Sequence, residues 1–205
     1  MEYIKEQETA AHKCFQDYRA IVVQRDENFF ILDWRGASGF AEYFVRYILD
    51  IKCGTLFISG DFGGCIVNWY KPVQPERLVG YFKNVSYFMD KLQCSSDTYT
   101  YLSTDIKEDL NAIKARLQPF ANADEIDSDF DKMFDLLNNC DLGEDTIYSD
   151  ELMELIDKYD GDECNDGFDT VGQRISPRVI LWAVGYRMAM QQLEEKEKTN
   201  ENVQI

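Results

Sequence analysis

The chain has 205 residues, of which 45% are hydrophobic and 14% aromatic, and its formal net charge is −17. This length and composition favour one domain, or one domain with a small appendage, around a sizeable core, and they argue against an intrinsically disordered chain. A sequence pI near 4.4 disfavours direct binding to nucleic acid or to an anionic membrane, so basic protein surfaces are the expected partners.

Targeting and redox signals are also informative. The longest apolar runs, such as Val179–Val184, are too short to span a bilayer, and the start Met-Glu-Tyr-Ile-Lys-Glu is not typical of a signal peptide. We therefore expect a cytoplasmic protein. The six cysteines lie at scattered spacings without a CxxC pair, so we expect them to be reduced and mostly buried.

The first half of the chain is typical of a sheet. The residues up to about Tyr18 form a weak helical pattern, and four strand-like segments then follow at 29–34, 42–50, 55–59 and 65–70. Short glycine-containing turns join them, which predicts an antiparallel meander. In the second segment Tyr43, Val45, Tyr47 and Leu49 share a wholly apolar face, which we predict to be the buried one.

The second half is typical of helices, because the apolar period changes from 2 to 3.6 near Pro72–Pro75. The expected helices cover 78–92 with a break near Asn84, then 106–117, 126–137, 148–159 and a last one that begins at Ser176 and Pro177, while 99–102 is a candidate edge strand. We expect the charged tail Glu194–Lys198 to fray.

The predicted fold class is therefore α+β, with an N-terminal four-stranded antiparallel β-meander followed by a helical C-terminal half whose helices cover one face of the meander. We expect a division into residues 1–74 and 75–205 within one compact unit.

Nearly all of the net charge lies between Asp124 and Asp169. This window holds 18 acidic residues and only two basic ones, Lys132 and Lys158, a balance of −16. Regular apolar spacing runs through the same window, so we expect it to fold rather than to form a disordered tail. A folded segment with this charge produces a directional electric field.

Two rows of carboxylates recur at helical spacing within this window. They are the candidate partner-binding residues Asp127, Asp131 and Asp135 on the first helix, and Asp150, Glu154 and Asp157 on the second. Neighbours at i, i+4 lie about 5–6 Å apart and repel one another by a few tenths of a kcal/mol per pair. Two interpretations stay open: a solvated face that keeps the protein soluble, or an interaction surface.

Other motifs carry less chemistry. The stretch Asp160–Asp169 is rich in oxygen ligands, but as an EF-hand loop it would place Cys164 and Gln173 at ligand positions, which favours an acidic connecting loop over a calcium site. Asp61-Phe62-Gly63 resembles a kinase metal-binding triplet, yet its place between two strands predicts a hairpin turn. The single histidine, His12, lies in a polar segment where we expect it to be exposed. No zinc-binding spacing is present, and no metal or cofactor is expected.

Aromatic side chains are dense in the meander, at Tyr43, Tyr47, Trp34, Trp69 and Tyr70. Aromatics on a sheet can stack nucleic-acid bases, but that use needs accompanying Lys or Arg side chains, which are few between 29 and 70. We therefore predict that these rings pack in the core.

Three segments, Phe30–Trp34, Thr55–Gly63 and Arg174–Trp182, together resemble small acidic proteins of Firmicutes phages and mobile elements. Some acidic phage proteins of this size resemble anti-defence proteins, including anti-CRISPR inhibitors. The resemblance covers most of the chain, and it implies the cytoplasm of a bacterial host but no catalytic residue.

The sequence thus suggests a non-enzymatic protein that binds and inhibits a host nucleic-acid-handling enzyme, with a CRISPR-Cas nuclease favoured, through an anionic surface that mimics nucleic acid. One alternative is a small divalent-metal-dependent hydrolase that uses Asp61 or the acidic loop. The other is an acidic host interaction module, with or without a response to calcium.

Overall fold

The computed structural model describes residues 2–36, 43–119, 122–140, 142, 148–159 and 167–203. Its contacts divide the chain into two compact units. Unit 1 comprises Met1–Thr98 with Ile175–Ile205, and unit 2 comprises Tyr99–Arg174. These boundaries differ from the expected division at 74/75, because the last helix returns to pack on the sheet that the first part of the chain forms.

Unit 1 contains a six-stranded antiparallel sheet with the strand order β1-β2-β3-β4-β5-β6. The strands are β1 (Tyr18–Arg25), β2 (Phe29–Gly36), β3 (Phe44–Asp50), β4 (Thr55–Gly60), β5 (Cys65–Asn68) and β6 (Leu92–Ser95). The α+β class and the meander β2–β5 are confirmed, but the sheet has six strands rather than four. The sequence does not reveal β1 because its apolar run Ile21–Val23 lacks alternation, and the register shifts between Val22 and Gln24.

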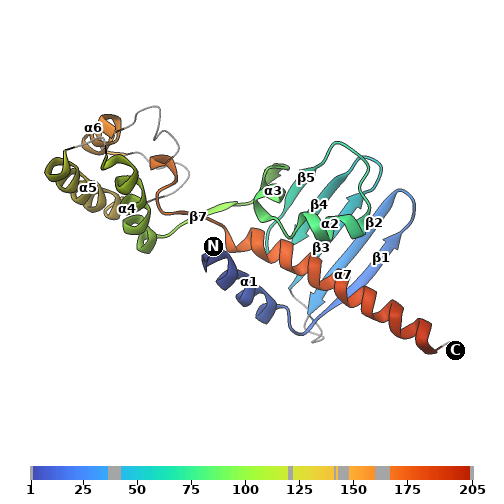
Figure 1. The fold of residues 1–205 in the computed structure, drawn as a ribbon. Helices are drawn as coiled ribbons and strands as arrows, with labels where there is room; N and C mark the ends of the chain where they lie inside the picture. The colour runs from blue at the N-terminus through green and yellow to red at the C-terminus, as the bar shows by residue number, and fades with distance from the viewer. Residues whose placement is uncertain are drawn as a thin grey trace. The chain divides into compact units, whose positions relative to one another are not determined.

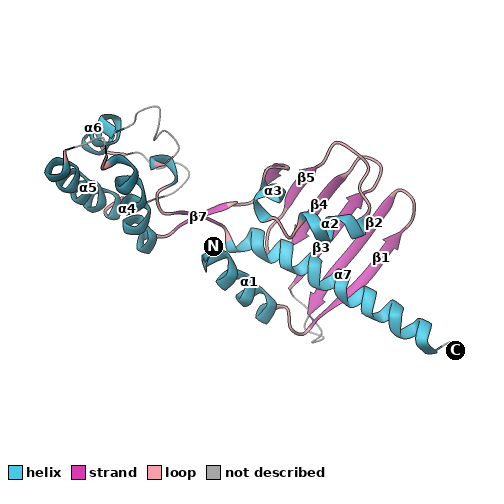
Figure 2. Ribbon diagram, in the orientation of Figure 1, coloured by secondary structure: helices cyan, strands magenta, loops and turns pink. Residues whose placement is uncertain are grey.

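Four helices belong to the same unit: α1 (Glu2–Cys14), α2 (Pro75–Tyr81), α3 (Val85–Met89) and α7 (Pro177–Val203). Figure 1 shows α7 across one face of the sheet with α1 beside it, and Figure 2 shows the same layers coloured by secondary structure. The Tyr47 hydroxyl donates to the Trp182 carbonyl oxygen at 2.8 Å, and the Tyr186 hydroxyl donates to that of Pro75 at 3.0 Å. All three aromatic side chains are fully buried, so the predicted apolar face of the last helix closes the core.

Two details of the helical pattern are resolved by the structure. The predicted break at Asn84 is confirmed, because the Asn84 side chain accepts a hydrogen bond from the Tyr87 backbone N–H and caps α3. The prediction that Glu194–Lys198 frays is wrong, since α7 continues to Val203. An i, i+4 ion pair between Lys198 and Glu194, at 2.7 Å, supports this last part of the helix.

The turn between β4 and β5 has the predicted hairpin geometry. Gly60 has a φ of +129°, which favours glycine. The next residue, Asp61, accepts a hydrogen bond from the Phe44 N–H at 2.7 Å and donates its own N–H to the Phe44 carbonyl at 3.1 Å. Asp61 therefore joins this turn to the start of β3.

The prediction that the meander aromatics pack in the core holds for three of the five. Trp34, Tyr47 and Trp69 are buried, but Tyr43 is 61% and Tyr70 is 73% exposed. Both exposed residues lie outside the ladder, one before β3 and the other after β5, so strand alternation does not govern them.

The expected burial of the cysteines is also wrong for most of those described. Cys14, Cys53 and Cys94 are exposed, Cys140 is half-buried, and Cys65 alone of the described cysteines is buried; all five are free thiols.

Unit 2 is inserted in the chain between β6 and α7. It contains β7 (Tyr99–Tyr101), a short 3-10 turn (Ser103–Asp105), α4 (Ile106–Leu117), α5 (Ala123–Asn138), α6 (Asp150–Tyr159), a second 3-10 turn (Phe168–Thr170) and β8 (Gln173–Ile175). The candidate strand at 99–102 exists as β7, which pairs with β8 rather than with the large sheet. Apolar side chains of α4, α5 and α6 bury one another in a separate core, which includes Ile113, Phe130 and Ile156.

Replacing Gly60 by Ala should lower the free energy of unfolding by about 2 kcal/mol or more, because a Cβ there would lie 2.1 Å from the Phe44 carbonyl oxygen at a positive φ. Gly80→Ala, within α2, is the matched control. A Cβ at that position meets nothing within 4 Å, so the change should be neutral or stabilise by up to about 1 kcal/mol. Urea unfolding followed by circular dichroism measures both, and equal effects of the two changes would contradict this turn geometry.

Candidate functional site

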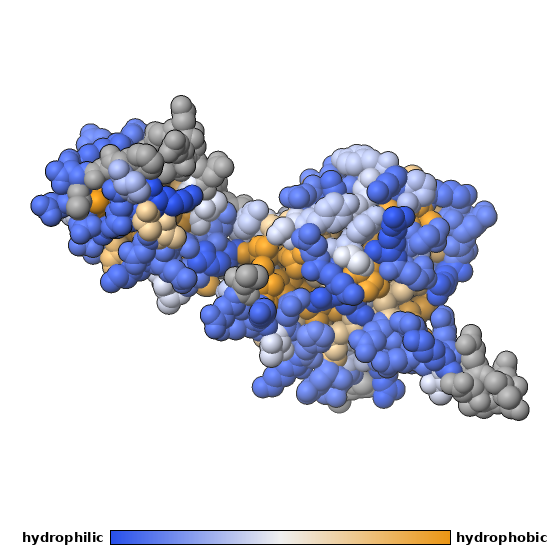
Figure 3. Space-filling view, viewed as in Figure 1, coloured by the Kyte–Doolittle hydropathy of each residue, from blue (hydrophilic) through white to orange (hydrophobic). Residues whose placement is uncertain are grey.

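The charge of the protein is divided unevenly between its two units. Unit 2 contains 21 Asp/Glu and six Lys/Arg residues, a balance of −15 out of the total of −17, whereas unit 1 is close to neutral. Figure 3 shows mostly hydrophilic residues over the visible face of the helices α4–α6. Because this unit has a hydrophobic core of its own, its acidic residues belong to a folded unit and not to a disordered tail.

All six predicted partner-binding carboxylates are exposed. Asp127, Asp131 and Asp135 lie on α5, and Asp150, Glu154 and Asp157 lie on α6. The apolar residues between them, such as Met133 and Leu152, are fully buried. Each helix therefore presents its carboxylates to solvent and its apolar stripe to the core, as the periodicity predicts.

A seam of ion pairs runs between the two helices. Lys158 on α6 donates to Glu125 at 2.5 Å and to Asp129 at 2.7 Å, and Lys132 on α5 pairs with Glu151 at 2.6 Å. The end of α6 thus pairs with the beginning of α5, and its beginning pairs with the later part of α5, so the two helices run antiparallel. We call these five residues the lysine seam.

The lysine seam determines how the two carboxylate rows lie. Successive residues of a helix are rotated by 100° about its axis. On each helix the apolar stripe therefore lies on one side of the seam residues, and the carboxylates lie on the other side, away from the core. These carboxylates are Asp131 and Asp135 on α5, and Asp150 and Glu154 on α6. In an antiparallel pair these outer sides point the same way, so the two rows flank the seam. This geometry places Asp131 and Asp135 of α5 and Asp150 and Glu154 of α6 on one surface, with both lysines of the acidic window between them.

Asp127 differs from the other five carboxylates. Its Oδ1 lies 2.7 Å from Nζ of Lys114 on α4, a lysine whose side chain is only 18% exposed. For the remaining five, no ion pair occurs within the part of the chain that the structure describes. The exposed negative field therefore comes mainly from Asp131, Asp135 and the α6 row.

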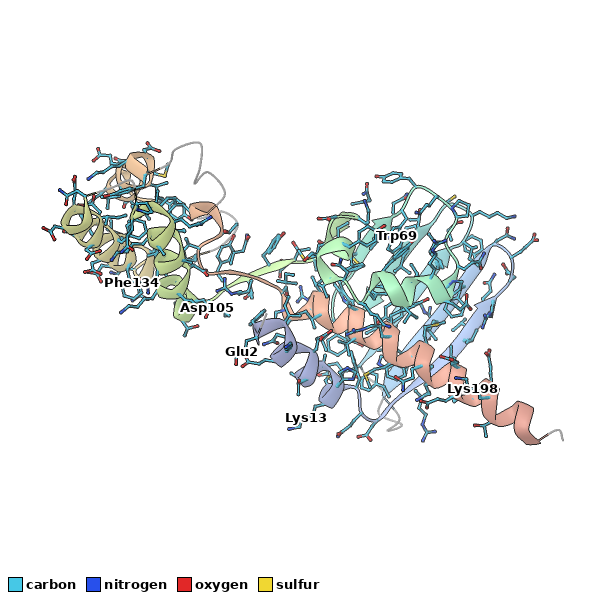
Figure 4. The ribbon with its side chains drawn as sticks, viewed as in Figure 1. Glu2, Lys13, Trp69, Asp105, Phe134 and Lys198 are labelled. Atoms are coloured by element: carbon cyan, nitrogen blue, oxygen red, sulfur yellow. The ribbon has the colours of Figure 1, made fainter. Side chains whose placement is uncertain are left out.

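Two further basic side chains of unit 2, Arg174 and Lys107, join its elements to one another. Arg174 in β8 pairs with Asp105 at 2.8 Å and with Asp109 at 2.9 Å, and these hydrogen bonds raise the pKa of its guanidinium. On the outer side of α4, Lys107 lies 5.7 Å from the centroid of the Phe134 ring. Figure 4 labels Asp105, which pairs with Arg174, and Phe134, whose ring faces Lys107. These contacts connect α4 to β8 and to α5.

Contacts at the lysine seam shift the pKa values of Asp129, of Lys158 and of the neighbouring Tyr159. Hydrogen bonds from Lys158 and from the Tyr159 hydroxyl lower the pKa of Asp129, and the same Asp129–Lys158 contact, followed by that to Glu125, raises the pKa of Lys158. Burial, with the hydrogen bond to Asp129, raises the pKa of Tyr159 to about 12. All of these groups therefore keep their usual charge state at neutral pH.

Sequence reasoning missed this seam because its ion pairs join residues that lie 19 to 33 positions apart on two different helices. A signal was nevertheless present: Lys132 and Lys158 are the only basic residues of the window, and each occupies the same side of its helix as Glu125 or Glu151.

The sequence also suggested a metal site in the acidic loop or at Asp61. Residues 160–166 of the acidic loop lie outside the described residues. Where the chain is described, no group of three or more His, Cys, Asp or Glu side chains is arranged to hold a metal ion. Asp61 stabilises a turn, as shown above, and His12 is exposed as expected. None of the helices in the described ranges is long and apolar enough to cross a membrane.

No protein-family model, no curated protein and no solved structure matches this chain.

Replacing Asp129 by Asn should destabilise unit 2, and the effect should depend on pH. The folded-state pKa of Asp129 is lowered, so its contribution is fully present above the unfolded value of about 3.9 and is lost as pH falls through the lower folded value. The difference in unfolding midpoint between wild type and Asp129→Asn should therefore be constant near neutral pH and shrink below about pH 4.

Asp131→Asn is the matched control, because Asp131 lies on the same helix and has no ion pair among the described residues. It should leave stability unchanged or raise it slightly at neutral pH, since it removes like-charge repulsion. Thermal unfolding followed by circular dichroism across this pH range separates the two variants. A pH-independent effect of Asp129→Asn, or an equal loss in the control, would refute the seam.

Proposed function

We propose that this protein is a non-enzymatic inhibitor that binds a nucleic-acid-handling defence enzyme of a bacterial host, with a CRISPR-Cas nuclease as the favoured target. The anionic surface of α5 and α6 occupies the positively charged site that normally holds nucleic acid. The observation that carries this proposal is the confinement of the charge to one compactly folded unit. A protein that needed acidic residues only for solubility could spread them over both units.

The geometry of the two helices supports this use. Carboxylates on successive helical turns lie about 5–6 Å apart, which is broadly similar to the spacing of phosphates along one DNA strand, although the charge per unit length of a duplex is set by both of its strands. The lysine seam and the apolar core hold the two rows in one arrangement, so little side-chain and backbone freedom is lost on binding.

An RNA-guided nuclease supplies a surface of the opposite charge. Such enzymes hold the guide–target heteroduplex in a positively charged channel and read the PAM with arginine side chains. A folded anionic body is attracted to such a channel over several ångströms, which raises the association rate and makes it depend on salt. Inhibition of this kind requires binding alone and no turnover.

Neutralising all six carboxylates to Asn or Gln should weaken binding to the nuclease at least tenfold, mainly through a slower association rate, and should reduce its salt dependence. The fold should remain, because the six side chains face solvent. Asp127→Asn alone should have the smallest effect of the six single changes, because Lys114 already neutralises Asp127. Exchanging Asp for Glu at the five Asp positions should be tolerated, since a field depends on charge more than on exact geometry.

A matched control neutralises six exposed acids of unit 1: Glu2, Glu6, Asp17, Glu27, Asp90 and Glu195. It changes the net charge by the same amount and should leave binding within about twofold of wild type if the field is local. Surface plasmon resonance against a purified guide-loaded nuclease at graded salt, together with a DNA-cleavage assay, measures both variants. Inhibition at wild-type strength after all six unit 2 changes, with the helical circular dichroism retained, would refute the proposal. A pull-down from cells that contain CRISPR effectors, washed at graded salt, identifies the nuclease to use.

A further inference from the structure

The sheet of unit 1 has a second face, which α1 and α7 do not cover. Strands β3 and β5, and β4 from Thr55 to Ser59, alternate: every second residue is buried on the helix-covered side, and every residue between them is half-buried or exposed. Cross-strand pairing determines which of these side chains lie next to one another on the uncovered face. Figure 1 shows the helical layer on the other side of the sheet.

An apolar stripe crosses this uncovered face. Ile31 lies opposite Ile48, Ile48 opposite Phe57, and Phe57 opposite Ile66, in four neighbouring strands. Cys94 in β6 continues the row opposite Ile66. At about 4.8 Å between strands, five strands give a stripe about 19 Å long, and its central side chain, Phe57, is 41% exposed. Phe57 and Cys94 are exposed and the three isoleucines are half-buried, and a contiguous apolar row that reaches solvent in this way is typical of an interaction surface.

A cluster of arginines lies beside the apolar stripe. Asp33 accepts two hydrogen bonds from Arg46, at 2.6 and 2.8 Å, and two from Arg35, at 2.9 and 2.8 Å. Its side chain is only 4% exposed, whereas those of the two arginines are about one-third exposed. The guanidinium groups therefore cover the carboxylate and present positive charge to solvent, and they lower the pKa of Asp33 despite its burial.

A third arginine adds to this cluster. Arg19 on β1 lies directly opposite Arg35, is exposed, and has no ion pair among the described residues. Like charges in opposite positions of a strand pair destabilise a sheet, and one carboxylate cannot neutralise three guanidinium groups. The cluster therefore carries a local charge of about +2 in a protein whose net charge is −17. The acid Asp50 also points to this face, at the end of β3, where it caps the Cys53 N–H.

We propose that this uncovered face docks a segment of a partner protein that carries an acidic side chain next to large apolar side chains. The apolar side chains cover the stripe of Ile31, Ile48, Phe57 and Ile66, and the carboxylate pairs with the arginine cluster of Arg19, Arg35 and Arg46. A guanidinium–carboxylate pair with two parallel hydrogen bonds gives such a contact both strength and direction.

Three observations select this occupant. The stripe contains three isoleucines and one aromatic ring, which suits aliphatic contact better than the stacking of bases. A second copy of the chain, face to face, would bring two positive clusters together. Addition of a strand at the free edge of β1 is hindered, because the Gln192 side chain already accepts from the Ala20 N–H at 2.8 Å and donates to the Tyr18 carbonyl at 3.2 Å.

The test uses the full chain and a random peptide library displayed on phage. A double variant, Arg19→Glu with Phe57→Ser, serves as the counter-selection target. Basic peptides that bind the acidic helices bind both proteins, and the counter-selection therefore removes them. Both side chains are exposed and neither has an ion pair among the described residues, so the double variant should fold, which thermal unfolding checks. Peptides that discriminate should pair Asp or Glu with large apolar residues.

Synthetic versions of these peptides should bind wild type and lose about tenfold in affinity, or ~1.4 kcal/mol, with each single variant. Arg77→Glu and Met153→Ser are the matched controls, since Arg77 is an exposed arginine of α2 without an ion pair among the described residues and Met153 is 42% exposed. The controls should bind within about twofold of wild type, and the six-carboxylate variant should bind as well as wild type, because all six carboxylates belong to unit 2 and the docking face belongs to unit 1.

Three results would overturn the proposal. The library yields no peptide that distinguishes wild type from the folded double variant, or the discriminating peptides lack acidic residues. The third result is that a single-stranded oligothymidylate binds wild type but not the double variant, which would assign this face to nucleic acid.

Discussion

The packing of α7 against the sheet is the interaction on which the rest of the structure depends. Trp182 and Tyr186 are fully buried between this helix and the strands, and their contacts with Tyr47 and Pro75 use both buried tyrosine hydroxyls as hydrogen-bond donors. An unpaired hydroxyl in this core would cost about 1–3 kcal/mol. The sheet therefore requires a helix that the sequence supplies only after residue 176.

The acidic helices are an insertion into that arrangement. The chain leaves unit 1 after Thr98 and returns at Ile175, and the 76 residues between form unit 2 with its own core. Repulsion among the carboxylates of α5 and α6 therefore acts on a small, separately packed body. The lysine seam offsets part of this repulsion by placing Lys132 and Lys158 between the two rows. This organisation lets the protein concentrate negative charge without burying any of it in the core beneath the sheet.

Much of the fold could be predicted from the sequence, because periodicity reports directly on which side of an element is buried. It revealed β2–β5, the three helices of unit 2 and the N-terminus of α7. It could not reveal β1 or β6, whose exposed edge positions follow no apolar alternation, nor the division into units, which depends on contacts between β3 and α7 that lie 135 positions apart. For the candidate site, helical spacing predicted which carboxylates are exposed. The pairing of Asp127 with Lys114 and the lysine seam were not predictable, since both join different helices. The uncovered arginine cluster was missed because Asp33 appeared as an ordinary strand residue.

Two surfaces of opposite character result from this architecture. The outer side of α5 and α6 is strongly anionic, whereas the uncovered face of the sheet combines an apolar stripe with positive charge. Each belongs to a different unit, so a contact at one does not use residues of the other. Under the two proposals, the helices bind a basic enzyme and the sheet binds a second protein.

Hydrogen–deuterium exchange on the full chain, free and mixed with a guide-loaded nuclease that the pull-down retains, measures which unit makes the proposed contact. If the anionic helices bind the nuclease, the backbone amides of α5 and α6 should exchange more slowly in the complex, while those of β2–β5 should be unchanged. Protection confined to unit 1, with α5 and α6 exchanging as in the free protein, would contradict this proposal.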